Sequence, residues 1–339
     1  MVILGHLIPG EIRQTFPRYA IYGFHMPLFF GICGYFIPRK SLTQMTFFAL
    51  VRKYWKRILL PWILAIQVFF VLENFDRFTS LTLSDYWKAY YLPYVHLWFI
   101  PGFFTFILLT WLFLNAIRLV LSMEQPTENL FFREHPASSA HNQILQNRRE
   151  RFTWIVLFSC ALLLSIVFCI YMHQTYETAE AINLQYLVMH DFHLYYYIFF
   201  VFGMFLRDTD LNLTKPLQQT LRSAMFLFGI LYLILFFFPN VLLEEVLKYC
   251  FNLLLIHWAL TACQTLSLPR NKTLEYIGRN SLAYYLYVQA AKTFTLHFFP
   301  YTETLWGYWL CVIPLTYVTF LIIGRCNKIP FIRHLFFGL

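Results

Sequence analysis

Residues 24–36, FHMPLFFGICGYF, place one histidine inside an apolar run that is long enough to enter a lipid bilayer. An ionisable side chain at membrane depth is costly, so such residues usually face a bundle interior or a water-filled cavity, where they serve chemistry or transport. Pro27 has no N–H and therefore frees a backbone carbonyl about one turn earlier, which often kinks a helix beside a cavity. We interpret His25 as a functional candidate, and the alternative is a histidine satisfied by a neighbouring helix.

The rest of the chain is apolar in the same way. Of its 339 residues, 59% are hydrophobic and only 13% are charged, a composition that soluble domains rarely have. A helix needs about 17–25 mainly apolar residues to cross the hydrocarbon core. Nine such spans are predicted, at 20–37, 58–73, 97–117, 152–172, 192–206, 223–239, 246–263, 281–298 and 305–324. We expect an all-α polytopic membrane bundle in which residues 1–339 form a single integral-membrane domain.

Basic residues gather in alternate loops. Most of the 26 Lys and Arg lie in segments 38–57, 118–151, 207–222, 264–280 and the C-terminal tail, whereas segment 173–193 has none. Cytoplasmic loops carry an excess of Lys and Arg. We therefore expect the C-terminus to be cytoplasmic, residues 122–150 to form a polar cytoplasmic loop, and residues 41–57 to include an amphipathic helix on the inner membrane face. The net charge of +9 reports this topology, and it indicates no nucleic-acid partner.

We predict no metal site. The seven cysteines lie in or beside apolar spans without the pair spacing of metal ligands, and we interpret them as packing residues. His190, Asp191 and His193 are the best alternative cluster, but their spacing suits neither a metal nor an acid–base pair.

The N-terminus is anomalous, because the apolar residues before Pro9 are too few to span a membrane. If Met1 is the true start, we expect the chain to begin on the outer side of the membrane. If the first helix is incomplete, it ends near His6. In that case a tenth helix begins before Met1.

Five segments carry family motifs. They are Leu4-Gly5-His6, residues 24–36, residues 56–61 (KRILLP), residues 96–101 (HLWFIP) and residues 278–286 (GRNSLAYYL). In this order they resemble acyltransferase family 3, whose bacterial membrane proteins O-acylate carbohydrates of the cell envelope and secreted carbohydrates. Two positions depart from the family pattern, since Cys33 replaces a frequent serine and Val288 replaces a frequent histidine.

The resemblance implies ten helices with both termini cytoplasmic, which agrees with the charge pattern if one helix precedes His6. It also implies that an acyl group, commonly acetyl from acetyl-CoA, passes from the cytoplasmic side of a bacterial inner membrane to a hydroxyl of an envelope polysaccharide or its lipid-linked precursor. Acyl-CoA is then the donor substrate, and we expect no permanently bound cofactor. His6 matches the family histidine, whose basic partner eleven positions earlier would lie before Met1.

Acyl transfer to a hydroxyl needs a base, and imidazole titrates near working pH. We expect His6 to be this base and His25 to assist it or to bind substrate. Whether transfer is direct or passes through an acyl-histidine stays open.

We expect Arg57 and Lys56 at the mouth of their span, with Arg279 and Ser281, to bind acyl-CoA, because guanidinium groups grip phosphates well. Positive-inside topology alone could explain these cations, and Ser281 could be a helix cap. His96 and Trp98 are expected to hold the acceptor sugar, although Trp98 could equally be an interfacial anchor.

Two other function classes compete. A transporter or flippase fits a polytopic protein, but glycine numbers only 12 and paired broken spans are not evident. A glycosyltransferase would rest on Asp208 and Asp210 as a metal-binding pair, and lone acidic pairs of this kind are common.

Overall fold

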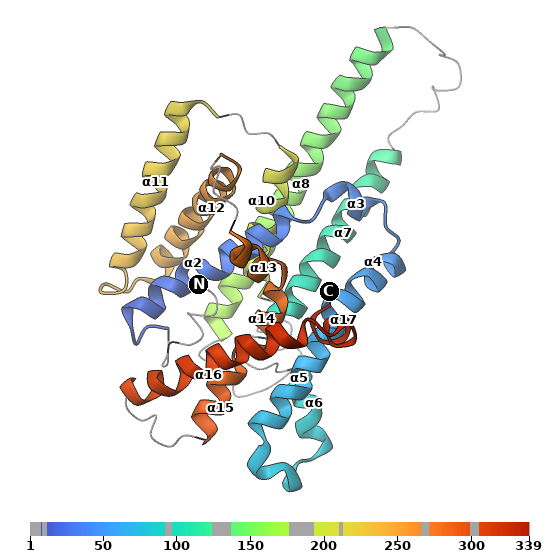
Figure 1. The fold of residues 1–339 in the computed structure, drawn as a ribbon. Coiled ribbons are helices and arrows are strands. Elements are labelled where there is room, and N and C mark those ends of the chain that lie inside the picture. The colour runs from blue at the N-terminus through green and yellow to red at the C-terminus, as the bar shows by residue number, and fades with distance from the viewer. Residues whose placement is uncertain are drawn as a thin grey trace.

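The computed structural model describes residues 8, 12–91, 97–123, 137–175, 193–209, 213–265, 271–298 and 305–338. Every regular element in these segments is helical, which confirms the all-α prediction (Figure 1). The α-helices are α2 (Phe16–Tyr35), α3 (Arg39–Thr43), α4 (Phe47–Tyr54), α5 (Leu60–Glu73), α6 (Leu83–Tyr91), α7 (Phe99–Met123), α8 (Ala137–Thr175), α10 (Tyr197–Asp208), α11 (Lys215–Ile234), α12 (Val241–Thr265), α13 (Lys272–Arg279), α14 (Ser281–Tyr287), α15 (Ala290–Phe298), α16 (Leu305–Cys326) and α17 (Pro330–Phe337). Shorter turns are η1 (Trp55–Leu59, a π-helix), η2 (Phe75–Ser80) and η5 (Leu194–Tyr196).

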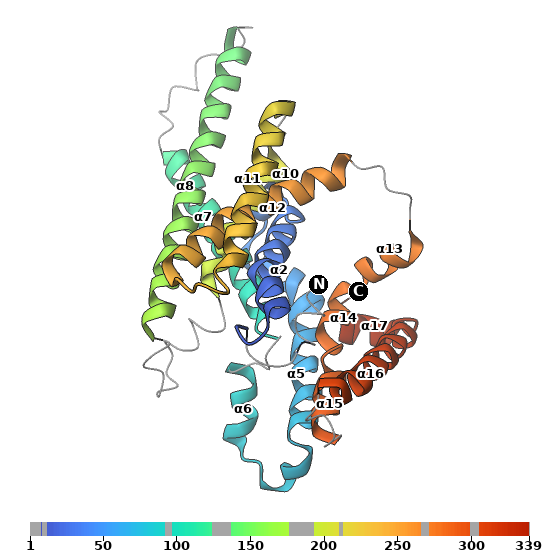
Figure 2. The ribbon, with the colours of Figure 1, turned by 90° about the vertical axis from the view of Figure 1, so that its left-hand side faces the viewer.

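Within the described residues, six helices are long and apolar enough to cross a membrane. They are Phe47–Glu73, Phe99–Ser122, Gln146–Ile170, Lys215–Ile234, Val241–Thr265 and Trp306–Cys326. The protein is therefore an integral membrane protein with a polytopic helical bundle. In Figure 2, α8 and the group α13–α17 lie on opposite sides of α2 and α5.

Three expected spans differ from this set. Residues 20–37 form most of α2, which is less apolar because it contains Arg18, His25 and several tyrosines. The span expected at 192–206 is a 12-residue helix, α10, that follows the short turn η5. The span expected at 281–298 divides into α14 and α15 at Val288 and Gln289, both of which are buried. Interrupted helices persist at membrane depth where protein surrounds their backbone.

Part of the polar segment at 122–150, which we expect to be a cytoplasmic loop, is helical. Helix α8 begins at Ala137, so residues 137–150 are helical and extend well beyond the neighbouring ribbon (Figure 1). Eight of these fourteen residues are the good helix formers Ala, Gln, Leu, Arg and Glu, and their intrinsic preference prevails over the polarity of the stretch.

The amphipathic segment predicted at 41–57 is helical but continues into a span. In α4, Leu50 and Tyr54 are buried while Arg52 and Lys53 are exposed, as an amphipathic helix requires. The π-turn η1 then joins α4 directly to α5. The two helices together form the candidate span Phe47–Glu73.

Helices α2 and α10 cross at backbone contact, and glycines make that approach possible. A Cβ atom added to Gly34 would lie 1.9 Å from the carbonyl oxygen of Phe200, and one added to Gly203 would lie 1.8 Å from that of Gly31. Small residues allow such close crossings in membranes. The glycines of residues 24–36 therefore fix the helix that carries His25.

Three basic segments meet at one end of the bundle, which we call the basic end. The Nε–H of Arg39, at the start of α3, donates to Asp208 over 2.9 Å. Arg207 donates to the carbonyl of Tyr35, and Arg118 donates to that of Thr43. The charge rule predicts that this end faces the cytoplasm.

At the opposite end, α6 follows α5. Thr82 and Asp85 cap α6 through reciprocal side-chain hydrogen bonds, of which the Thr82 Oγ1 to Asp85 bond measures 2.6 Å. The hydrogen bonds from Thr82 hold the pKa of Asp85 below its usual value.

Candidate functional site

A proline inside α2 creates the local geometry around His25. Pro27 has no N–H to donate to the carbonyl of Gly23, four residues earlier. The amide Nδ2 of Asn252, on α12, donates to this carbonyl over 2.8 Å and to the Lys248 carbonyl over 2.7 Å. Asn252 is fully buried, so the freed carbonyl has its partner inside the protein. The proline break is thereby joined to a second helix two residues from His25.

The imidazole of His25 lies almost wholly inside the bundle, with 2% of its surface exposed. Its Nδ1 lies 2.9 Å from the carbonyl oxygen of Ile21. Because a carbonyl can only accept, Nδ1 carries the proton and donates it, which leaves Nε2 as the basic nitrogen of the neutral ring. The ring of Tyr22 packs edge-on against the imidazole at 4.6 Å between centroids. His25 is therefore held in one tautomer and one orientation.

An aromatic stack lies beside this pair. The indole of Trp98, just before α7, stacks on the imidazole of His193 at 3.7 Å between centroids, with Tyr196 on one side at 6.2 Å. Phe30 of α2, the helix of His25, packs against both rings, with centroids 6.3 Å from Trp98 and 5.5 Å from Tyr196. We call Tyr22, His25, Trp98, His193 and Tyr196 the His25 cluster.

His193 has a backbone conformation that an L residue rarely adopts. Its φ is 42° and its ψ is 46°. Among the described residues other than glycine, His193 alone has a positive φ. Such a conformation costs about 1–3 kcal/mol and is found disproportionately at functional sites. Ser165 of α8 holds the turn after His193 and the start of α10, since its Oγ donates to the Leu194 carbonyl over 3.4 Å and accepts from the Ile198 N–H over 3.3 Å. The strained residue is also the one that stacks on Trp98.

Two cations lie near the cluster. Arg18 packs over the ring of Tyr22 at 5.0 Å and donates to its hydroxyl over 3.4 Å. Lys248 forms an ion pair with Glu245 at 3.1 Å and lies over the ring of Tyr195. Charges on Arg18 and Lys248 both act on His25. The site therefore combines an imidazole, phenol hydroxyl groups and positive charge.

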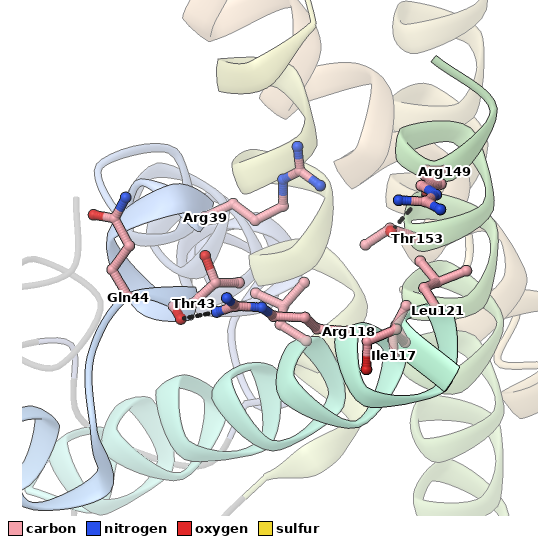
Figure 3. Close-up of a pocket in the computed structure, with 10 residues that line it drawn as sticks. Arg39, Thr43, Gln44, Ile117, Arg118, Leu121, Arg149 and Thr153 are labelled. Atoms are coloured by element: carbon pink, nitrogen blue, oxygen red, sulfur yellow. Dashed lines mark hydrogen bonds between the residues drawn. The ribbon is translucent and has the colours of Figure 1, made fainter. Parts of the chain in front are cut away.

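A separate cavity opens at the basic end between α3, α7 and α8. Its volume is about 500 Å³, and three arginines line it, namely Arg39, Arg118 and Arg149 (Figure 3). Arg39 is engaged by Asp208 at 2.9 Å and Glu150 at 3.7 Å, and it packs over the ring of Trp154. Arg118 hydrogen-bonds only to a backbone carbonyl, that of Thr43, over 3.2 Å in the part of the chain that the structure describes. We call this space the arginine cavity.

The predicted donor residues lie elsewhere. Lys56 and Arg57 are exposed in η1. Gly338, near the C-terminus, packs so closely on Arg57 that a Cβ atom added to it would meet the Arg57 backbone. Arg279, at the end of α13, is exposed and pairs with Glu275 one turn earlier. Ser281 begins α14 after Asn280 and is also exposed. Among the described residues, no hydrogen bond, ion pair or ring contact joins Lys56 or Arg57 to Arg279 or Ser281.

Of the other predicted residues, His6 and His96 lie outside the described residues, and so do His190 and Asp191. Trp98 lies in the His25 cluster, where its indole stacks on His193. No group of three or more potential metal ligands occurs in the segments that the structure describes. Asp208, which the glycosyltransferase hypothesis assigned to metal binding, is instead paired with Arg39.

Sequence reasoning missed four residues. Pro27 predicts that the Gly23 carbonyl is free of its helical hydrogen bond, but it does not predict the partner Asn252, because 229 residues separate Asn252 from Gly23. Arg39, Arg118 and Arg149 were counted only as topology signals, since nothing in their spacing brings them to one cavity. A polar residue such as Asn252 within an apolar span was the available signal.

The fold and the site together define a membrane-embedded helical protein with a buried histidine whose Nδ1 faces a backbone carbonyl. The sequence model described as an acyltransferase domain matches residues 1–325, and the chain belongs to this family, acyltransferase family 3. The comparison with curated proteins found no match, and the comparison with solved structures found none either. Family membership makes the protein a membrane acyltransferase, which requires an acyl donor, an acceptor and the lipid bilayer.

Proposed function

We propose that the protein is an O-acyltransferase of a bacterial inner membrane. It takes an acyl group, most simply acetyl from acetyl-CoA, at the cytoplasmic face and transfers it to a hydroxyl of an envelope polysaccharide or its lipid-linked precursor. The C–S bond of the thioester breaks and a C–O bond forms. A histidine takes the hydroxyl proton, and the departing thiolate of coenzyme A takes up a proton in turn.

The observation that carries this proposal is the fixed tautomer of His25 within a family of acyltransferases. With its Nδ1–H donated to the Ile21 carbonyl, Nε2 is the nitrogen that can accept a proton. The family motif makes His6 the expected base. In the proposed mechanism His6 abstracts the hydroxyl proton, and His25 supports it as a proton acceptor or hydrogen-bond partner.

The arginine cavity supports binding of the donor at the basic end. Its volume of about 500 Å³ lies within the usual range of ligand pockets, about 300–1,000 Å³. Arginine binds phosphate through two parallel hydrogen bonds. Arg118, which uses a backbone carbonyl as its partner, can turn its guanidinium toward a phosphate without breaking an ion pair. Lys56, Arg57, Arg279 and Ser281 remain the second proposed donor site.

The Trp98–His193 stack supports binding of the acceptor. Flat aromatic faces pack against sugar rings, and a histidine edge can hydrogen-bond their hydroxyls. In this proposal Trp98 and His96 hold the sugar so that one hydroxyl approaches the histidines.

The test is transfer of labelled acetyl from acetyl-CoA by the full chain in nanodiscs. The acceptor is envelope polysaccharide isolated from a strain that lacks the gene. The proposal expects label in the polysaccharide with matched release of free thiol, and loss of both in His6→Ala. Thiol release without label in the glycan, or no release with any acyl-CoA, would refute it.

A further inference from the structure

A second groove lies between α11 and α12, in the halves of these helices nearest the basic end. Its volume is about 570 Å³, and its polar lining includes Lys215, Gln218 and Arg222 from α11 with His257, Trp258 and Thr261 from α12. The helices are antiparallel neighbours with extensive contact. None of these residues belongs to the His25 cluster or the arginine cavity.

The groove holds two positive charges that the described residues do not neutralise. Lys215 and Arg222 are the charged residues of α11, and neither forms an ion pair within the described part of the chain. The acidic residues of α12, Glu244 and Glu245, lie near its other end, where they pair with Arg13 and Lys248. An anion can therefore enter the groove without displacing an existing partner.

Arg222 lies deeper in its candidate membrane span than Lys215 does. It lies seven residues after Lys215, which corresponds to about 10 Å along the helix axis, inside a candidate span. A cation at that depth needs a partner or a path to the interface. Gln218 and Thr261 lie between Arg222 and the helix ends, so polar groups continue from Arg222 to the surface.

The same groove has apolar walls that open toward lipid. Leu221 and Leu254 line it, and Trp258 is 42% exposed beside them. Further along α11, Phe226 and Ile230 are more than half exposed. The polar part suits a phosphate and the apolar part suits acyl chains, which is the chemistry of a phospholipid and not of a free nucleotide.

We propose that this groove is a binding site for an anionic phospholipid. The phosphate lies between Lys215 and Arg222, and the acyl chains follow Leu221, Leu254 and the exposed face of α11. The lipid packs along α12, whose Gln264 donates to the Tyr35 hydroxyl of α2 over 2.8 Å. It therefore supports the helix pair that flanks the histidine helix, and the site is independent of the proposed reaction.

Native mass spectrometry of the full chain in detergent, with phosphatidylglycerol or phosphatidylcholine added at equal concentration, tests this proposal. We expect preferential binding of phosphatidylglycerol. Each basic residue near an anionic lipid contributes about 1 kcal/mol, so the variant K215Q/R222Q should bind it about 30-fold more weakly. The variant R325Q/K328Q removes two cations outside the groove and should bind like the parent chain.

A second measurement keeps both cations of the groove. Brominated phosphatidylglycerol should quench tryptophan fluorescence more than brominated phosphatidylcholine does, and Trp258→Phe should remove that difference. Equal binding of both lipids, or equal loss in K215Q/R222Q and R325Q/K328Q, would overturn the proposal. Displacement of phosphatidylglycerol by coenzyme A at similar concentration would overturn it too, since the groove would then bind the nucleotide.

Discussion

The proton on Nδ1 of His25 is fixed by the Ile21 carbonyl, and this gives its two nitrogens different tasks. Asparagine can keep the donation to the carbonyl but offers no base, whereas glutamine places an amide near the position of Nε2. If His25 accepts a proton during transfer, both substitutions should lower the rate by about 10²–10⁴-fold. If it only donates a hydrogen bond from Nδ1, His25→Asn should stay near the parent rate.

The measurement is thiol release from acetyl-CoA in nanodiscs, with polysaccharide present. Thermal stability of each variant is the control for folding. Parent-like turnover in His25→Asn would contradict the proton-acceptor role.

Asn252 and Pro27 form a pair that can be tested by compensation. Asn252→Ala leaves the buried Gly23 carbonyl without its side-chain donor, which should cost about 1–3 kcal/mol. Pro27→Ala supplies an N–H that can reach the same carbonyl as in a regular helix. The double variant should therefore be more stable than Asn252→Ala alone.

Unfolding of the purified variants, followed by denaturant or heat, gives this coupling. Additive losses in the double variant would show that Asn252 does not act through the proline break.

Arg118 and Arg57 separate the two proposed donor sites. A charge-assisted hydrogen bond contributes about 1.5–3 kcal/mol, so the residue that holds a phosphate should raise KM for acyl-CoA about 10–100-fold when changed to Gln. We expect Arg118→Gln to show this effect. Arg151→Gln, which changes an exposed cation of α8 outside the arginine cavity, is the matched control.

If KM for acyl-CoA rises in Arg57→Gln and does not rise in Arg118→Gln, the donor site lies at η1 and not in the arginine cavity. Equal effects in Arg151→Gln would indicate a general loss of surface charge.

At the scale of single residues, the sequence predicted the features that depend on residue type and on close neighbours along the chain. His25, the freed carbonyl beside it and Trp98 followed from residue type and neighbours. Asn252 and the meeting of Arg39, Arg118 and Arg149 depend on contacts between distant helices, which no local pattern encodes.

At the scale of elements, the α2–α10 crossing depends on the absence of side chains. Gly203→Ala would place a Cβ atom 1.8 Å from the Gly31 carbonyl, so the helices must separate. Overpacking of this kind costs about 1–3 kcal/mol or more, and it moves the helix that carries His25. The Cβ of Gly278→Ala meets nothing within 4 Å, which makes that variant the control.

Folded yield and thermal stability in detergent should fall for Gly203→Ala and not for Gly278→Ala. Equal behaviour of the two variants would contradict the close crossing.

Helix boundaries were harder to predict than helix existence. Apolar content predicted helices in all nine expected spans, but residues 281–298 divide into α14 and α15, and residues 137–150 extend α8. A break at Val288 and Gln289 has no glycine or proline to signal it, since both residues continue a helix readily elsewhere. Tertiary packing decides such positions.

At the scale of the whole molecule, the bundle separates two chemistries. Arginines gather at the basic end, and His25 lies inside the bundle beside an aromatic stack. The proposed donor with phosphates and the proposed acceptor with a sugar ring suit these two environments. The charge pattern predicted which loops share an end, and Arg39–Asp208 and Arg118–Thr43 contacts agree with it for segments 38–57, 118–151 and 207–222.

Mass spectrometry of the envelope polysaccharide tests the central claim most directly. The samples come from cells that carry the gene, from a deletion, and from deletions complemented with the parent chain or with His6→Ala. The account predicts that an O-acyl mass disappears in the deletion, returns with the parent chain, and does not return with His6→Ala although that protein is present in the membrane. An unchanged polysaccharide in the deletion would contradict it.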